Sequence, residues 1–110
     1  MKYGSIAFLL VVGFGTSALA GQLSRDELLQ LISGKTVGLG IGGSSIYGPD
    51  GRYKFVFGDG RVNEGNYYVA DGTICVRFDN GHARCDRIEK VGTAYFMTDH
   101  KGDQFPFEPQ

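Results

Sequence analysis

The spacing of apolar positions changes twice along the chain. An uncharged, mostly apolar stretch runs from Ile6 to Gly15, a spacing of three and four follows between residues 24 and 33, and after Gly34 the period falls to two. A spacing of three and four indicates one face of a helix, and alternation indicates strands with one buried face. The chain therefore predicts a leader, one short helix and then a series of β-strands.

The leader has the parts of a cleaved signal peptide. Lys2 precedes the apolar stretch, and Ala18-Leu19-Ala20 supplies the small residues that signal peptidase recognises, with Gly21 as the new N-terminus. The stretch is shorter than the run of about 20 apolar residues that a spanning helix needs. No cysteine stands directly after the cleavage site, so a lipid anchor is not expected. We predict removal of residues 1–20, no membrane span in the mature chain, and a periplasmic or secreted bacterial protein.

One short helix is predicted over residues 24–33, with signals at both ends. Ser24 and Glu27 have the spacing of a capping box, in which each side chain accepts a hydrogen bond from a free backbone N–H of the first turn. Gly34 stands where a left-handed residue ends a helix. The apolar face must pack against the rest of the domain, and it consists of Leu28, Leu31 and Ile32.

Turn dipeptides recur at the spacing of a β-meander. Pairs that end in glycine begin at residues 50, 59, 71, 80, 91 and 101, which are 9, 12, 9, 11 and 10 residues apart. Such pairs between β-branched and aromatic runs are typical of antiparallel strands. The expected strands are residues 36–41, 45–47, 52–57, 62–69, 73–78, 83–88 and 93–98. We predict one mainly β domain over residues 21–110, either an antiparallel meander or a small closed barrel of about seven to eight strands.

The C-terminal segment, residues 104–110, is predicted to be a tail. It contains Pro106 and Pro109, and proline cannot pair within a central strand because it has no N–H to donate. We expect this tail to pack over an open end of the sheet.

Two cysteines constrain one hairpin. After removal of the signal peptide 90 residues remain, with ten basic and twelve acidic side chains and a net charge of −2. A chain of this size buries only about 60–65% of its unfolded surface, so a covalent link would help it to fold. Export brings Cys75 and Cys85 into an oxidising compartment, where we expect them to form a disulfide.

The register of this hairpin has two alternatives. A three-residue loop at residues 79–81 places Cys75 opposite Cys85, whereas a two-residue Asn-Gly turn places them on opposite faces of the sheet. We favour the register that allows the disulfide. It carries a conflict that the sequence leaves open, because it puts three polar residues on the face of three apolar ones: His82, Arg84 and Asp86 with Ile74, Val76 and Phe78.

Charge balance and motif context exclude several classes of function. The chain has eleven basic and twelve acidic residues, so it offers no strongly basic surface for nucleic acid.

Residues 38–43 match G-x-G-x-x-G, but a helix precedes them and strands follow, the reverse of a dinucleotide site. These glycines instead indicate tight curvature or close approach of another element, such as the N-terminal helix. Gly34-Lys35-Thr36 lacks the upstream glycine of a phosphate-binding loop. We expect no cofactor.

No combination of residues in the sequence points to catalysis. A nucleophile needs a base and an orienting group, but His82 and His100 both fall in expected turns and the cysteines are expected to be oxidised. Asp99, His100 and Asp103 could supply metal ligands, although a solvated loop is the favoured interpretation. We therefore expect a non-enzymatic protein with no catalytic residue and no metal. A cleft that held a histidine beside a carboxylate would favour an enzyme instead.

Charged and aromatic side chains near the hairpin are the candidates for binding a partner. Its arginines, together with Arg52 and Arg61, could form a patch for an anionic ligand. The favoured alternative is cross-strand pairing of these arginines with Asp86, Glu64 and Glu89. Tyr67 and Tyr68 are adjacent, so one of them must face outward. The candidate binding residues are Arg77, Asn80, His82, Arg84, Arg87 and Tyr67.

The order of these features resembles a family of small exported bacterial proteins of unknown function. The resemblance covers most of residues 23–88, and its motifs are Leu23-x-x-x-Glu27-Leu28, Gly34-Lys35-Thr36-Val37, Tyr47-x-Pro49-Asp50-Gly51-Arg52, Gly65-x-Tyr67-x-Val69, Asp71-Gly72-x-Ile74-Cys75 and Cys85. The chain departs from the family at Tyr67 and Asp86, where many members carry Trp. The resemblance implies a helix with a compact β-sheet or lipocalin-like barrel, and it supplies no catalytic residue.

These observations together favour a binding protein. We expect an exported β-domain that binds a small amphipathic ligand or an envelope protein, and a ligand-binding domain should have a concave apolar mouth. The alternative is an inhibitor of an exported hydrolase, either a protease or a cell-wall lytic enzyme. Such an inhibitor would act through the hairpin tip at Asn80-Gly81-His82.

Overall fold

The turns predicted from the glycine dipeptides are present and divide the chain into short strands. The glycine of each of the six predicted dipeptides has a positive φ. The computed structural model describes residues 21–41 and 43–110, so the predicted signal peptide lies outside the described residues. One helix, α1 (Arg25–Ile32), precedes the main series of strands. The strands are β2 (Gly21–Gln22), β3 (Lys35–Gly38), β4 (Ser44–Tyr47), β5 (Arg52–Val56), β6 (Val62–Ala70), β7 (Thr73–Phe78), β8 (Ala83–Val91), β9 (Ala94–Thr98), β10 (Gln104–Pro106) and β11 (Glu108–Pro109).

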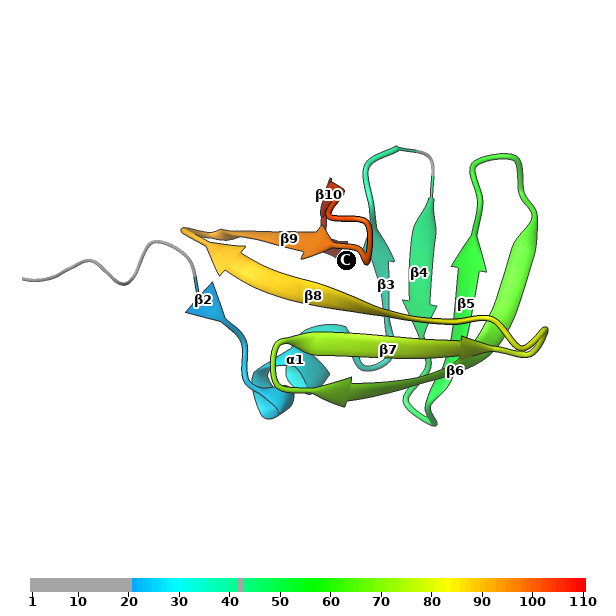
Figure 1. The fold of residues 1–110 in the computed structure, drawn as a ribbon, viewed down its shortest axis with the longest axis horizontal. Coiled ribbons are helices and arrows are strands. Elements are labelled where there is room, and N and C mark those ends of the chain that lie inside the picture. The colour runs from blue at the N-terminus through cyan, green and yellow to red at the C-terminus, as the bar shows by residue number, and fades with distance from the viewer. Residues whose placement is uncertain (1–20, 42) are drawn as a thin grey trace, which may run out of the picture.

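All the strands belong to one antiparallel sheet that curls into a nearly closed barrel (Figure 1). The strand order is β10-β9-β8-β7-β6-β5-β4-β3-β11, and the short β2 pairs with β8 outside this path. Consecutive strands are neighbours from β3 to β10, as in a meander. The prediction of a mainly β fold that forms a small lipocalin-like barrel is therefore confirmed.

The C-terminal segment closes the barrel, which the sequence did not predict. It was expected to pack over an open end as a tail, but it forms β10 beside β9 and β11 beside β3. The Phe107 N–H donates to the Tyr95 carbonyl at 3.0 Å, and the Gln110 N–H donates to the Thr36 carbonyl at 3.0 Å. The segment thus bridges the two edges of the sheet in pieces of two or three residues. Its prolines are tolerated because these pieces lie at the seam and not within a long central strand.

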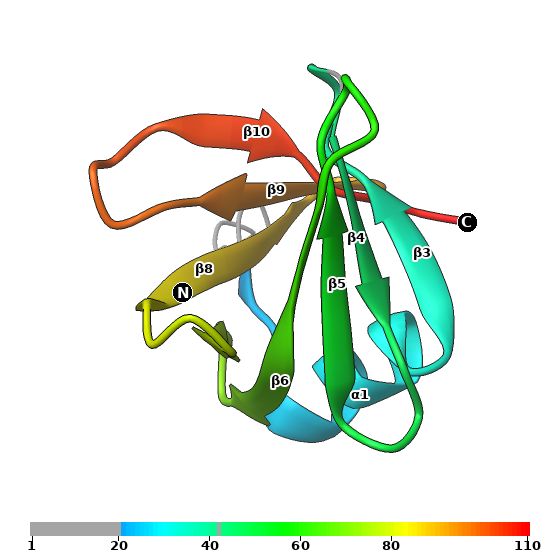
Figure 2. The same ribbon diagram turned by 90° about the vertical axis from the view of Figure 1, so that its right-hand side faces the viewer.

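The helix lies at one end of the barrel, opposite the β3–β4 and β5–β6 loops (Figure 2). The capping box is present: the Ser24 hydroxyl accepts from the Glu27 N–H at 3.2 Å, and the Glu27 carboxylate accepts from the Ser24 N–H at 2.8 Å. Leu28 and Ile32 are fully buried. The apolar face of the helix therefore fills that end of the core, as its spacing predicted.

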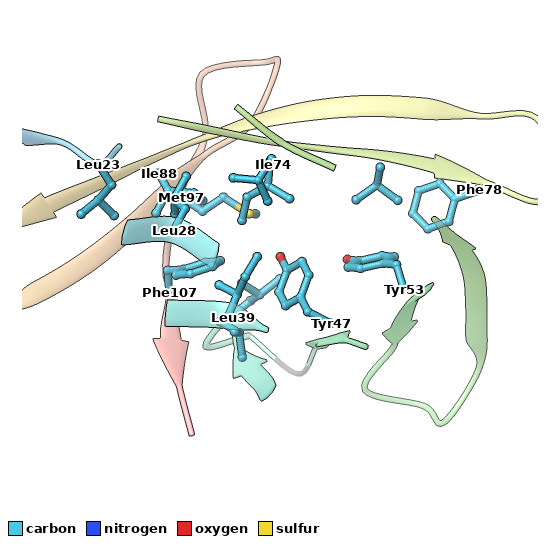
Figure 3. Close-up of a cluster of buried hydrophobic side chains, with 14 residues drawn as sticks. Leu23, Leu28, Leu39, Tyr47, Tyr53, Ile74, Phe78, Ile88, Met97 and Phe107 are labelled. Carbon is cyan, nitrogen blue, oxygen red and sulfur yellow. The ribbon is translucent and has the colours of Figure 1, made fainter. Parts of the chain in front are cut away.

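The core is formed by aliphatic and aromatic side chains from the helix, the strands and the C-terminal segment (Figure 3). The rings of Tyr47 and Tyr53 lie 5.3 Å apart between their centroids, and Tyr47 also packs edge-on against Tyr67 at 5.1 Å. Phe107, from the segment that closes the barrel, is 1% exposed. The segment that closes the sheet therefore also contributes to the core.

The glycine-rich segment after β3 is approached closely by another element, but not by the helix. A Cβ at Gly40 would lie 2.9 Å from Pro106 of β10, and a Cβ at Gly38 would lie 3.2 Å from the Gln110 side chain. The prediction of a close approach is thus correct, and its suggested partner was wrong. The C-terminal segment occupies this place because it is the element that joins β3 to β9.

The hairpin of β7 and β8 adopts the register that the disulfide requires. Cys75 lies opposite Cys85, and the two are bonded. The Phe78 N–H donates to the His82 carbonyl at 2.8 Å, which closes the three-residue loop with Gly81 at a φ of 96°. The conflict noted in the sequence is therefore real, because Arg84 and Asp86 lie opposite Val76 and Ile74 on the inner face of the barrel.

Candidate functional site

Arg84 and Asp86 lie inside the barrel, where polar residues are expensive unless they are paired. Asp86 is 4% exposed, and the side chain of Arg84 is 28% exposed. The Arg84 Nε donates to Asp86 Oδ2 at 3.0 Å. The register that the disulfide requires points both side chains inward, and the ion pair offsets part of the free-energy cost of burying them.

The ion pair is the end of a chain of hydrogen bonds across the interior. The Arg84 Nη2 donates to the Tyr53 hydroxyl at 3.3 Å, and that hydroxyl lies 2.7 Å from the Ser45 hydroxyl. Ser45 and Tyr53 are each 1% exposed. Figure 3 shows the hydroxyl of Tyr53 pointing into the cluster, toward the ring of Tyr47. Residues of β4, β5 and β8 thus form one buried polar network.

Two features of Asp86 set it apart from the rest of this network. Burial raises the pKa of its carboxyl above the ordinary value, and the neighbouring Arg84 guanidinium opposes that rise. Its second oxygen, Oδ1, is buried and has no hydrogen-bond partner in the described part of the chain. An unpartnered buried oxygen of this kind is rare in proteins and calls for an explanation.

A cavity of about 420 Å³ opens beside this network, at the end of the barrel away from the helix. It lies between the β3–β4 loop, the β5–β6 loop and the turn that joins β9 to β10, all visible in Figure 2. Its volume is within the range of small-molecule sites. Most of its wall is apolar, from Leu39, Ile41, Phe55, Phe57, Met97 and Phe105. Its polar lining comes from Arg84, Asp86, Asp99, His100 and Lys101.

Two aromatic residues of the wall, Phe55 of β5 and Phe57 just after that strand, pack against each other. Phe55 and Phe57 meet edge to face, with centroids 4.7 Å apart. The Arg84 guanidinium carbon lies 5.7 Å from the Phe55 centroid, within range of a cation–π contact. The wall therefore joins an apolar surface to the charged pair below it.

The turn at residues 99–102 forms the polar rim, and its acidic side chain is occupied by the backbone. Asp99 Oδ1 accepts from the N–H groups of Lys101 and Asp103, both at 2.9 Å. Burial alone would raise the pKa of Asp99, but these hydrogen bonds hold it below its ordinary value. Within residues 21–41 and 43–110, no group of three metal-ligating side chains is close enough to hold an ion.

His100 lines the cavity together with two carboxylates, Asp86 on the floor and Asp99 on the rim, the arrangement that would favour an enzyme. The residue is exposed, however, and within the described residues no hydrogen bond or ion pair joins its ring to Asp86 or Asp99. The other histidine, His82, is exposed in the hairpin turn and does not line the cavity. Neither ring is oriented for proton transfer by a neighbouring carboxylate.

The five predicted binding residues of the hairpin fall into three separate places. Arg77 and Arg87 are exposed on the outer face of the hairpin, while Asn80 and His82 are exposed at its tip. Arg84 alone lies inside, in the lining of the cavity. An arginine patch that joins Arg77, Arg84 and Arg87 is therefore excluded, because residues an odd number apart on one strand face opposite sides of the sheet.

Tyr67 is not at the cavity mouth. Its ring packs against Tyr47, and its hydroxyl donates to the Gly48 carbonyl at 2.7 Å. The adjacent Tyr68 is the outward-facing residue of the two, with 65% of its surface exposed.

Ion pairs engage three of the arginines, but only Arg52 with Glu64 is a cross-strand pair that the favoured alternative named, since Arg84 and Asp86 both belong to β8. Arg84 pairs with Asp86, and Arg52 lies 3.5 Å from Glu64 and 3.0 Å from Asp79. Arg61 pairs with Asp59 within one turn at 2.7 Å, which the sequence analysis did not anticipate.

Most of the cavity was missed by reasoning from the sequence. Its lining comes from four segments that are far apart in the chain and meet only when the barrel closes. One signal was available: the disulfide register put Arg84 and Asp86 on the apolar face, and charged residues in that position are often functional.

Comparisons of the chain with family models, curated proteins and solved structures found no match. The resemblance to a family of small exported proteins therefore stays a prediction. Within the described residues, no helix has both the length and the apolar character to cross a membrane.

Proposed function

We propose that this protein is an exported, non-enzymatic β-barrel that binds a small amphipathic ligand in the cavity between the β3–β4, β5–β6 and β9–β10 connections. The observation that carries the proposal is the cavity itself, in which an apolar and largely aromatic wall surrounds a buried ion pair. Sites for small molecules combine these properties, because apolar walls supply affinity and a few fixed polar groups supply orientation.

Binding is favoured over catalysis by the way the polar groups are held. Asp86 Oδ2 is engaged by Arg84, and Asp99 Oδ1 is engaged by two backbone N–H groups. These contacts fix the carboxylates and leave His100 on the exposed rim. A site that holds its ligand needs fixed groups of this kind.

Export is supported by the disulfide and by the leader sequence. A disulfide in a small domain is typical of an oxidising compartment, and Cys75–Cys85 is formed. We expect the protein recovered from the envelope fraction of a bacterium that expresses the full chain to begin at Gly21. Measurement of its intact mass tests this, and a mass that includes residues 1–20 would contradict export with cleavage.

The proposed function is tested by capture of the mature protein from an envelope extract, followed by mass spectrometry of the small molecules it carries. We expect a small molecule to accompany the wild type and to be lost from Phe57→Ala, because Phe57 lines the cavity without belonging to the buried core. Tyr68→Ala is the matched control, since this aromatic residue is exposed outside the cavity. A molecule retained equally by all three proteins, or lost equally by both variants, would contradict binding in the cavity.

A second candidate function, inhibition of an exported hydrolase, is supported by the hairpin tip. Residues 79–83 are all exposed, and the turn projects past β6 at the right of Figure 1. Asn80 Oδ1 accepts from the His82 N–H at 2.9 Å, and Arg52 holds Asp79 from β5. A braced, exposed loop loses little entropy when it enters an active-site cleft.

Activity assays against a lytic murein hydrolase and a serine protease test this candidate. Inhibition at micromolar protein that is lost in an Asn80→Ala/His82→Ala variant, and kept in Phe57→Ala, would support it. An absence of inhibition at that concentration would contradict it.

A further inference from the structure

We infer that the cavity selects neutral ligands that carry a hydrogen-bond donor, a hydroxyl or an N–H group, on a flat apolar body. The inference rests on the proposed function and adds the chemical class of the ligand. Three observations support it: the unpartnered oxygen of Asp86, the balance of charge around the cavity, and the aromatic wall.

Asp86 has two carboxylate oxygens, and only one of them receives a hydrogen bond from the described part of the chain. Oδ2 receives the Arg84 Nε at 3.0 Å, whereas Oδ1 is buried and has no partner in the described part of the chain. A buried acceptor that gives up water without gaining a hydrogen bond destabilises the folded protein. Asp86 lines the cavity, so a small rotation of its carboxylate would let a donor on a bound ligand restore that bond. Among residues 21–41 and 43–110, the second unpartnered buried side-chain oxygen is Thr98 Oγ1, and Thr98 does not line the cavity.

The charges that face the cavity balance each other. Arg84 and Asp86 are paired on its floor, and Lys101 and Asp99 lie on its rim with His100 between them. An anionic ligand near the floor would compete with Asp86 for Arg84, and a cationic one beside Asp86 would meet the Arg84 guanidinium. Because a charge transferred from water needs a free partner of opposite sign, a neutral donor suits this floor better than an ion.

The wall determines the shape of the ligand body. Phe55, Phe57 and Phe105 bring aromatic rings to the lining, and Met97 adds a flexible side chain that contacts rings well. A flat aromatic or fused-ring body can pack between these side chains while its donor reaches Asp86. Phenols, aromatic alcohols and indole-like compounds combine the two properties.

A matched pair of compounds separates the contribution of the ligand's hydrogen-bond donor to affinity from that of its apolar body. We compare 2-naphthol with 2-methoxynaphthalene, in which a methyl group replaces the only donor hydrogen. Binding to the full mature protein is followed by the fluorescence of each compound, because the chain contains no tryptophan. We expect 2-naphthol to bind at least about tenfold more tightly, the effect of one hydrogen bond to a charged acceptor. Naphthalene-2-sulfonate and 2-naphthylmethylammonium should both bind more weakly than 2-naphthol.

The variant Asp86→Asn tests whether Asp86 is the residue that accepts the hydrogen bond from the ligand. The Arg84 Nε needs an acceptor, so the amide oxygen of the variant should take the place of Oδ2 and its NH₂ group should replace Oδ1. The preference for 2-naphthol should then disappear. Asp103→Asn is the control, because it removes an exposed carboxylate that does not line the cavity and should leave the preference unchanged.

Each outcome supports or overturns a separate statement. Equal affinity of the wild type for 2-naphthol and 2-methoxynaphthalene overturns the donor requirement while the cavity remains a binding site. Failure of both compounds and of the charged analogues to bind overturns the inference together with the proposed function. Tighter binding of either charged analogue overturns the selection for neutral ligands, and a preference that persists in a folded Asp86→Asn variant overturns the role of Asp86. The comparison of compounds uses the native protein, so it does not depend on whether that variant folds.

Discussion

At the residue scale, the interior of the barrel holds two charged side chains because each is matched to a partner. Arg84 donates to both Asp86 and Tyr53, and Tyr53 is hydrogen-bonded to Ser45. Removing one member of such a network leaves its neighbours buried and unpaired, and that costs more than the lost hydrogen bond alone. The network therefore fixes the floor of the cavity before any ligand arrives.

The substitution Tyr53→Phe tests this dependence. It removes one oxygen atom, so the Ser45 hydroxyl and the Arg84 Nη2 each lose the hydrogen bond they make to it, and we expect the free energy of unfolding to fall by about 1–3 kcal/mol. Tyr68→Phe removes an exposed hydroxyl and should change it by less than about 0.5 kcal/mol. Urea unfolding of the two variants measures the difference, and equal stabilities would show that the Tyr53 hydroxyl does not support the network.

The raised pKa of Asp86 predicts a pH dependence of stability with a definite sign. Burial makes the folded protein hold the Asp86 proton to higher pH than the unfolded chain does. Because the folded state then binds more protons, the contribution of Asp86 to stability falls as the pH rises above about 4, the ordinary value for a free aspartate. The unfolding free energy of the wild type minus that of Asp86→Asn should therefore decrease between pH 4 and neutrality.

Other carboxyl groups act in the opposite direction and cancel in this comparison. The pKa values of Asp59 and Asp79 are lowered by their hydrogen bonds to arginine or backbone groups, so both groups stabilise the fold as they ionise. They are present in the wild type and in the variant alike. A difference that increases with pH over that range would contradict a raised pKa for Asp86.

At the element scale, the β7–β8 hairpin shows what sequence reasoning could and could not reach. The disulfide expected from export favoured the three-residue loop and its register over a two-residue turn, and both are confirmed. The same register put Arg84 and Asp86 on the inner face, and the sequence offered no reason for it. The reason is tertiary, since Arg84 also donates to the hydroxyl of Tyr53 on β5, which is in turn hydrogen-bonded to Ser45 of β4.

Replacing both cysteines with serine should weaken the fold without changing it. The disulfide closes a loop of ten residues in sequence separation. Loop-closure entropy then predicts a loss of about 2.5–3 kcal/mol in the free energy of unfolding. The far-ultraviolet circular dichroism should keep its β-sheet form below the lowered melting temperature. Melting that is the same with and without reductant in the wild type would show that the bond does not contribute.

The glycine-rich segment and the C-terminal strands depend on each other, and a matched pair of substitutions shows it. Gly40 and Gly60 both have left-handed φ values, 88° and 93°, so alanine should cost about 1–2 kcal/mol at either site. Only at Gly40 would the new Cβ meet another element, Pro106 at 2.9 Å. Gly40→Ala should therefore lower the melting temperature clearly more than Gly60→Ala, and equal effects would contradict a tight contact with β10.

At the scale of the whole molecule, closure of the sheet creates both the core and the cavity. Glycine spacing and alternation sufficed to predict the seven strands β3 to β9 and their meander, but not β2, β10 or β11, because turn chemistry and the period of two are local properties. Closure of the barrel by residues 104–110 could not be predicted from such local patterns, since it depends on which edges the curled sheet brings together. The cavity forms only when the sheet closes, so the set of residues that lines it could not be predicted from the sequence.

The central claim, that a small ligand binds in this cavity, is tested most directly by nuclear magnetic resonance. We predict that titration of the mature protein with 2-naphthol shifts the backbone amide signals around the cavity, in residues 39–41, 55–58, 84–86 and 97–101. The β6–β7 turn at residues 70–73, which does not line the cavity, should be unaffected. Shifts confined to the hairpin tip at residues 79–82, or no shifts at saturating compound, would contradict the account.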